Sequence, residues 1–228
     1  MSTMPWRILV ITDLGVDSGE PASVTAPTLP AWFASLPLAV QPSALAPTVQ
    51  LAAGVAGAAL DTFLHDPRQQ RIEAAARGLE RLLAEAGDPV RVAALSLPRK
   101  TLIERFRETV HGPGLMASEP WTLVVLDFDF THKSEDLAAL AALSAMAAEL
   151  QAPVVANAGA GFFELRYLVQ AGAVKDIAAR LASPAHAGWQ ALQKTEDTRW
   201  LCLTLNRFLL REPWQLEEIG RASCRERV

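Results

Sequence analysis

The chain has 228 residues, 50% of them hydrophobic, and a formal net charge of −4. This length and apolar content are sufficient for a buried core in one or two domains. A weakly acidic chain with no basic run is a poor candidate for binding nucleic acid or an anionic membrane surface, and no stretch approaches the ~20 apolar residues of a membrane span, so no membrane insertion is expected. Two cysteines imply no disulfide framework. Without a signal-peptide-like start, the composition predicts a soluble cytoplasmic protein.

The first 48 residues divide into a strand and a linker. Residues 7–12 form an apolar, β-branched run that ends at Asp13, which predicts a buried strand within residues 1–15. Prolines recur throughout residues 16–48, and their spacing excludes a regular helix or a central strand. We therefore expect an ordered or semi-ordered, Pro-rich linker. Three apolar side chains can dock it on the remainder of the chain: Trp32, Phe33 and Leu36.

Residues 49–217 alternate between helical and extended patterns. An Ala-rich helix is expected from about residue 48 to Leu64, and a second one presents Ile72 and Leu79 on one face and stops at Gly87. Further elements follow in order: strands at 90–95, 121–126, 153–156 and 200–204, a helix after Pro98, a turn at 111–114, and a helix over 134–150 with Ser134 as its N-cap. Apolar strands separated by helices predict an α/β fold, mainly a parallel sheet flanked by helices.

The last residues, 218–228, break with the Ala/Leu-rich composition before them. They resemble the in-frame translation of a common sequencing adapter. We interpret them as an artefact, so that the authentic sequence stops near Glu217 without a natural end. Independently sequenced DNA of the source would then diverge near this residue and continue an open reading frame.

The sharpest candidate for catalysis is Asp127 with Asp129. An apolar strand followed by Asp-x-Asp-x-Thr resembles the first motif of haloacid-dehalogenase-type phosphatases, in which the first Asp attacks phosphorus and the second serves as general acid and base. That chemistry also needs a Lys and a further acidic pair to hold Mg²⁺. Lys175 and the pair Glu196 and Asp197 are present, but they do not follow an apolar strand. The simpler interpretation is that Asp127 and Asp129 cap the following helix or pair with an arginine. A Mg²⁺-dependent phosphate-ester assay separates the two interpretations.

Other motifs point to structure rather than chemistry. Residues 157–162 hold two glycines between a strand and a helix, but Glu164 stands where a dinucleotide fingerprint needs its third glycine, so a tight turn is favoured. The histidines are scattered singly, without metal-ligand spacing. Cys202 lies in an apolar strand, which favours a core residue over a nucleophile. We expect no catalytic residue, no metal and no cofactor.

Four segments, in order and with matching spacing, resemble the large subunit of the bacterial type VI secretion contractile sheath, the TssC/VipB family. They fall within residues 60–214: 63–79, 123–136, 151–158 and 181–214. The chain departs from the family's pattern at Ala76, Leu126 and Asn206, where the family has Trp, Gly and Pro. The first expected strand, in residues 5–15, resembles the opening of the small sheath subunit and of some divergent large subunits.

The resemblance implies a structural protein rather than an enzyme. In the family, large and small (TssB/VipA) subunits form heterodimers in the cytoplasm, which stack with other sheath protomers around the Hcp tube on a baseplate. Contraction drives the tube through the envelope, and the ClpV ATPase recycles the spent sheath. The family's region beyond Trp214, which exchanges strands between protomers, is expected to be missing here. The Asp-x-Asp of the phosphatase interpretation then corresponds to an Asp-x-Glu of the sheath family.

The segment 196–211 is charged at both ends and apolar between. Because a strand at 200–204 would be buried, its flanking charges need partners, and we expect Glu196 or Asp197 to pair with an arginine. The candidate arginines for such structural pairs are Arg199, Arg207 and Arg211. Three hypotheses remain: a sheath subunit, a phosphatase that uses Asp127, and a stand-alone α/β interaction domain. A neighbouring gene for a small sheath subunit would argue against the third.

Overall fold

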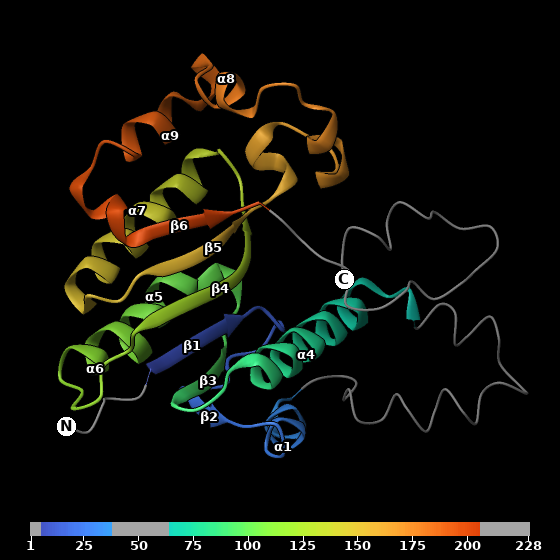
Figure 1. Cartoon of the computed structure of the whole chain (residues 1–228), viewed down its shortest axis with the longest axis vertical. Helices are drawn as coiled ribbons and strands as arrows, with labels where there is room; N and C mark the ends of the chain where they lie inside the picture. Colours follow the sequence, from blue (N-terminus) through green and yellow to red (C-terminus); the bar gives the residue numbers. More distant parts are fainter. Residues whose placement is uncertain (1–5, 38–63, 206–228) are drawn as a thin grey trace, which may run out of the picture.

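A computed structural model describes residues 6–37 and 64–205, which build an α/β structure on one six-stranded sheet (Figure 1). The strands lie in the order β2-β3-β1-β4-β5-β6. All neighbours pair in parallel except β2, which runs antiparallel to β3. The strands are β1 (Trp6–Thr12), β2 (Ala22–Val24), β3 (Val90–Ser96), β4 (Leu123–Phe130), β5 (Val154–Ala158) and β6 (Leu201–Thr204). The prediction of a mainly parallel sheet flanked by helices is confirmed.

Strand β1 occupies the centre of the sheet, between β3 and β4. Its Leu9 and Ile11 are fully buried, as expected for an apolar run in a parallel sheet that is covered on both faces. The strand expected in residues 1–15 therefore belongs to the same sheet as the strands of the following region.

The proline-rich region contains a helix, α1 (Leu29–Ser35), so the expectation of no regular helix is wrong there. Pro30 lies in the first turn of α1, where its missing N–H has no intrahelical partner to lose. The docking expected of this region is confirmed, because Trp32, Phe33 and Leu36 are all buried. Strand β2 is short and lies at the edge of the sheet, which is a position that tolerates nearby proline.

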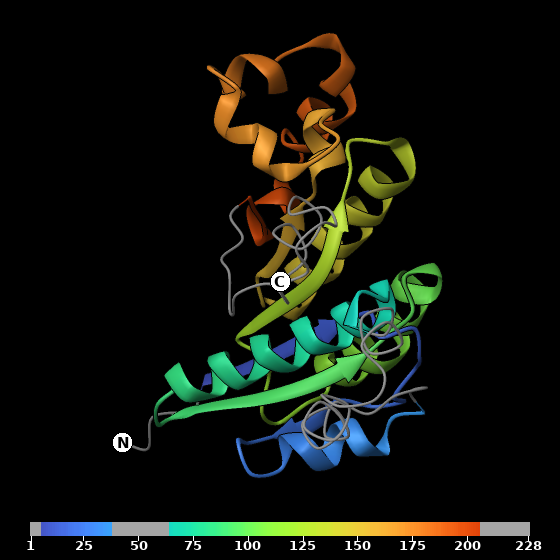
Figure 2. The same ribbon diagram turned by 90° about the vertical axis from the view of Figure 1, so that its right-hand side faces the viewer.

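Helix α4 (Pro67–Glu85) is capped by Asp66, the residue before it. The Asp66 side chain accepts hydrogen bonds from the backbone N–H groups of Arg68 and Gln69. The apolar face expected for this helix is buried at Ile72 and Leu79. Together with α1, it covers one face of the sheet over β1 and β3 (Figure 2). The helix expected before it, from about residue 48, lies outside the described residues up to residue 63.

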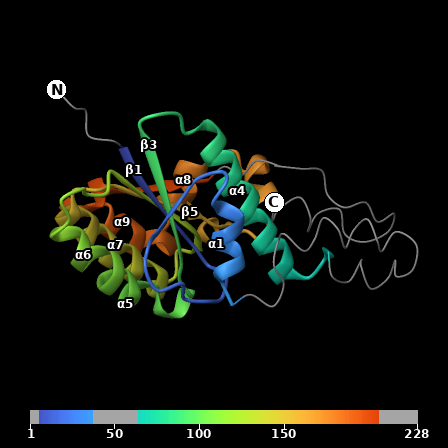
Figure 3. The same cartoon turned by 90° about the horizontal axis from the view of Figure 1, so that it is seen from below.

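The opposite face of the sheet is covered by a second set of helices (Figure 3). These are α5 (Leu102–Phe106), α7 (Ser134–Leu150) and α9 (Ala187–Leu192), with α6 (Gly112–Leu115) and α8 (Ile177–Leu181) beside them. The turn expected at residues 111–114 is wrong: a π-helical turn at Arg107–His111 leads directly into α6, which accommodates Pro113 in its first turn. Within the described residues, no helix has the length and apolar character needed to cross a membrane.

Candidate functional site

The two faces of the sheet are covered unequally. Helices α1 and α4 pack over β1 and β3 and reach Val125 of β4, and within residues 6–37 and 64–205 no helix extends over the same face of β5, β6 and the carboxyl half of β4 (Figures 2 and 3). We call this part of the sheet the open face. Its side chains alternate with the core residues of the three strands: Val125, Asp127 and Asp129 of β4, Val155 and Asn157 of β5, and Cys202 and Thr204 of β6.

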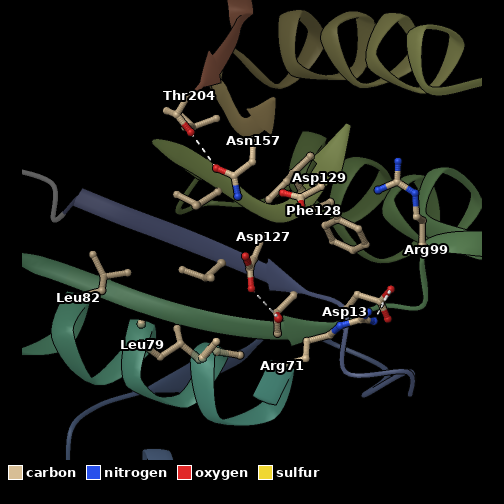
Figure 4. A pocket seen from close by; sticks show the side chains of 18 of the residues that line it. Asp13, Arg71, Leu79, Leu82, Arg99, Asp127, Phe128, Asp129, Asn157 and Thr204 are labelled. Atoms are coloured by element: carbon tan, nitrogen blue, oxygen red, sulfur yellow. Dashed lines mark hydrogen bonds and ion pairs between the residues drawn. The ribbon is translucent and has the colours of Figure 1, made fainter. Parts of the chain in front are cut away.

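A pocket of about 790 Å³ lies between α4 and the open face (Figure 4). Leu79 and Leu82 line it from the helix, and Asp127 and Asp129 line it from β4. Asn157 adds an amide, whose oxygen accepts a hydrogen bond from the Thr204 hydroxyl at 2.8 Å. The pocket therefore combines an apolar wall with carboxylate and amide groups.

The strand expected to end at residue 126 continues to Phe130, which corrects the placement of Asp127 and Asp129. Both lie within β4, not after it, and their side chains are exposed on the open face. Because successive side chains of a strand point to opposite faces of the sheet, Phe128 and Phe130 point away from the open face, and both are buried. The Thr12 hydroxyl of β1 donates to the Asp127 carboxylate at 3.2 Å.

The start of α7 is held by a different aspartate, Asp136. Its Oδ2 accepts from the backbone N–H and the hydroxyl of Thr131, both at 2.7 Å, and its Oδ1 accepts from the Arg99 guanidinium at 2.5 Å. Ser134 was expected to cap this helix, but no side chain caps it at the N-cap position, which is Lys133. Burial acts to raise the pKa of Asp136, but the hydrogen bonds from Thr131 and Arg99 outweigh burial and hold that pKa below its ordinary value.

The phosphatase constellation is not assembled at this pocket. Glu196 and Asp197 precede β6, so they lie at the amino end of the parallel strands, whereas Asp127 and Asp129 lie toward the carboxyl end. Neither they nor Lys175 line the pocket. Across the described ranges, no three His, Cys, Asp or Glu side chains form a group that could hold a metal ion.

Two histidines that the sequence showed as isolated lie together beside β5. The rings of His132 and His186 have centroids 5.0 Å apart. His186 is fully buried, and its Nε2 donates to the Phe162 carbonyl at 2.7 Å. The Nδ1 of His132 donates to the neighbouring Gly161 carbonyl, also at 2.7 Å. Both rings therefore hold the 3-10 turn Ala160–Phe163, which confirms the tight turn expected after β5. Sequence spacing gave no signal for this pair, because the two histidines come from different loops.

The expectation that Cys202 is a core residue is wrong: its side chain is exposed. Among the described residues, strand β6 is the edge of the sheet, and helices cover only one of its faces. Leu201 and Leu203 pack against that covered side, while Cys202 points to the open face. An apolar sequence pattern alone does not reveal which face of a strand lacks its cover.

Of the charges expected to pair, Glu196 and Arg199 form a salt bridge at 3.3 Å, with side chains 80% and 65% exposed. Asp197 is exposed. Arg207 and Arg211 lie outside the described residues. The Glu196–Arg199 pair is therefore a surface pair, whereas the sequence had suggested a buried one.

Because exposed ion pairs contribute only about 0–1 kcal/mol, we expect Arg199→Ala to lower the melting temperature by less than about 4 °C. Arg99→Ala is the matched comparison, since Arg99 bonds the shielded carboxylate of Asp136. It should lower the melting temperature clearly more in the same thermal-denaturation measurement. Equal losses for the two variants would show that the pair at Glu196 is not a surface pair.

The described residues thus form an α/β domain on one mainly parallel sheet, part of which no described helix covers. Comparison with known sequences agrees with this class. Residues 53–225, most of the chain, match the sequence model of the VipB family, described as EvpB/VC_A0108, tail sheath N-terminal domain, and the chain belongs to this family.

The chain is also similar to the type VI secretion system sheath protein TssC1 of Pseudomonas aeruginosa. The two are 25% identical over 174 residues, which cover 69% of this chain. The aligned part spans 35% of the length of that relative. The resemblance to the large sheath subunit is confirmed by both comparisons.

Proposed function

We propose that this chain is a structural part of a type VI secretion sheath and performs no catalysis of its own. It would pair with the small sheath subunit (TssB/VipA) in the cytoplasm and stack with other protomers around the Hcp tube, on a baseplate. Contraction of that sheath would drive the tube outward, and the ClpV ATPase would act on the contracted form. The observation that carries the proposal is the match of residues 53–225 to the tail-sheath family.

Two structural features support an assembly role. The open face leaves apolar and charged side chains of three strands without a helical cover within the described residues. The outer edge of β6 has no neighbouring strand in the described part of the chain, and such an edge can pair with a strand from another subunit.

The test is co-expression of this chain with its cognate small subunit, followed by affinity purification and electron microscopy. We expect the two chains to co-purify. Because the match spans 35% of the relative's length, we expect regular tubules only when the chain is extended to the full length of that relative. The small subunit expressed alone is the control. Failure to co-purify would contradict the proposal, and tubules from the unextended chain would show that the elements needed for assembly are already present.

A further inference from the structure

The connection from β5 to β6 contains a long stretch without a buried residue. Residues 164–185 include the 3-10 helix Leu168–Ala173 and α8, and each of these residues is at least partly exposed. The stretch lies between buried residues, with Phe162 and Phe163 before it and His186 after it. In Figure 1 the stretch loops out beyond the sheet, with α8 at its far end. We call residues 164–185 the strap.

The turn that precedes the strap is fixed to the sheet. In this turn, Ala160–Phe163, two carbonyls accept the histidine hydrogen bonds described above. Just before it, the Gly159 N–H donates to the Phe130 carbonyl at 2.9 Å. A Cβ added at Gly161 would lie 3.0 Å from the side chain of Thr131, so glycine permits the turn to approach the end of β4 closely. The turn therefore belongs to the rigid part of the domain.

The next carbonyl of this turn accepts a hydrogen bond from the strap itself. The Nη1 of Arg180, in α8, donates to the Phe163 carbonyl at 2.6 Å. Between them, Glu164 has a φ of 55°, and this left-handed residue reverses the chain where the strap begins. Because the donor is charged, this bond is stronger than a bond between neutral groups. It closes the strap onto its own starting point.

The other end of the strap is held from α9. The Nε2 of Gln190 donates to the carbonyls of Leu181 and Ser183, at 2.9 and 3.0 Å. Other hydrogen bonds of the strap are local: the Gln170 side chain accepts from two backbone N–H groups before it, and Asp176 caps α8. The strap therefore keeps local structure of its own, and Arg180 and Gln190 tie it to the rigid part.

The apolar contacts of the strap are shallow. Leu165, Ile177 and Leu181 pack against the main core cluster, but each stays partly exposed. Val169 is 71% exposed. The free energy of opening a segment rises with the apolar surface that opening exposes to water. Opening of the strap should therefore require much less free energy than unfolding of the sheet.

We propose that the strap is a conformational device that opens as one unit by local unfolding, while the six-stranded sheet stays folded, and that Arg180 holds it closed. Opening removes the partial cover that Leu165, Ile177 and Leu181 give to the core. The domain then presents apolar surface at this place without unfolding. The inference is independent of the proposed role in a sheath, because it concerns the isolated chain.

Native-state hydrogen exchange of the whole chain, followed by mass spectrometry of its peptides, tests this proposal. Amides of the strap should exchange at least about a hundredfold faster than those of β4 and α7, after correction for intrinsic rates. Arg180→Gln should accelerate exchange in the strap about ten- to a hundredfold, because it removes a charged donor. Exchange in β4 and α7 should stay unchanged, which also shows that the variant is folded. Equal protection of strap and sheet, or an Arg180→Gln strap that exchanges as slowly as before, would overturn the proposal.

Two further variants separate the bond from other effects. Arg166→Gln removes the same charge from the strap, but Arg166 stacks on the neighbouring Tyr167 within the strap, so exchange should change less than about twofold. An acceleration equal to that of Arg180→Gln would show a general charge effect and overturn the role of Arg180. Gln190→Met removes the tie at the other end and should accelerate the whole strap. Acceleration confined to the residues beside Gln190 would show that the strap does not open as one unit.

Discussion

Replacing His186 with alanine is expected to lower the free energy of unfolding by about 3–4 kcal/mol, since it removes a fully buried ring and a buried hydrogen bond together. The Phe162 carbonyl, which accepts from Nε2, would lose its partner. The ring also contacts His132, and Phe162 in turn packs edge-to-face on Trp189 at 5.2 Å. Thermal denaturation should show a fall in the melting temperature of roughly 10 °C.

Two further variants divide this loss into its parts. His186→Phe keeps a ring in the site but leaves the carbonyl without a donor, so it should cost about 1–3 kcal/mol. His111→Ala is the matched control: its partner Glu149 is 61% exposed, and the loss should stay below about 1 kcal/mol. A His186→Ala chain as stable as the His111→Ala chain would show that the buried bond does not hold the turn.

The main elements of the fold could be predicted because they follow strong local patterns. Strands β3 and β5 and helix α4 lie where apolar patterns placed them, and helix α7 lies where an acidic first turn and an Ala/Leu-rich composition predicted it. Helix α1 was missed because prolines were counted as helix breakers, although Pro30 stands in the one turn that tolerates it. The extension of β4 through Asp127 and Asp129 was missed because the sheet was expected to be covered on both faces. In such a sheet, a carboxylate is expected only after the end of a strand.

The candidate site was harder to predict, because it depends on which strand faces the described helices leave without a cover. The sequence of β6 is apolar on both sides, so nothing local distinguished Leu203, which packs on the helices, from the exposed Cys202. In the same way, His132 contacts His186 because the chain after β5 folds back beside the segment that follows β4. The spacing of the two histidines in the sequence does not predict this contact. Local sequence determines the elements, but the layers that cover them depend on long-range packing.

Asp136→Asn is expected to lower the free energy of unfolding by about 2–3 kcal/mol at neutral pH, although asparagine has nearly the same size. The carboxylate accepts from two Thr131 donors on one oxygen and from Arg99 on the other. The asparagine side chain has one carbonyl oxygen that accepts hydrogen bonds and one NH₂ group that can only donate them. Its NH₂ group must therefore face either the Thr131 donors or the Arg99 guanidinium, which are themselves donors. Arg99, which also stacks on the Phe130 ring at 4.9 Å, would lose its charged partner. The melting temperature should fall by roughly 5–10 °C.

The pH dependence identifies the charge as the cause. The pKa of Asp136 is lowered in the folded protein, so the native state binds its proton less readily than the unfolded chain does. The resulting stabilisation is complete above the unfolded pKa of about 3.9 and is lost as the pH falls through the lower folded pKa. The stability difference between the native chain and Asp136→Asn should therefore be constant from pH 7 to about 5 and narrow below about pH 4. Glu135→Gln, one residue earlier and exposed, should show only a small difference over the same range. If the Asp136→Asn difference persisted undiminished at the lowest pH at which both chains remain folded, the aspartate would act by packing and not through its charge.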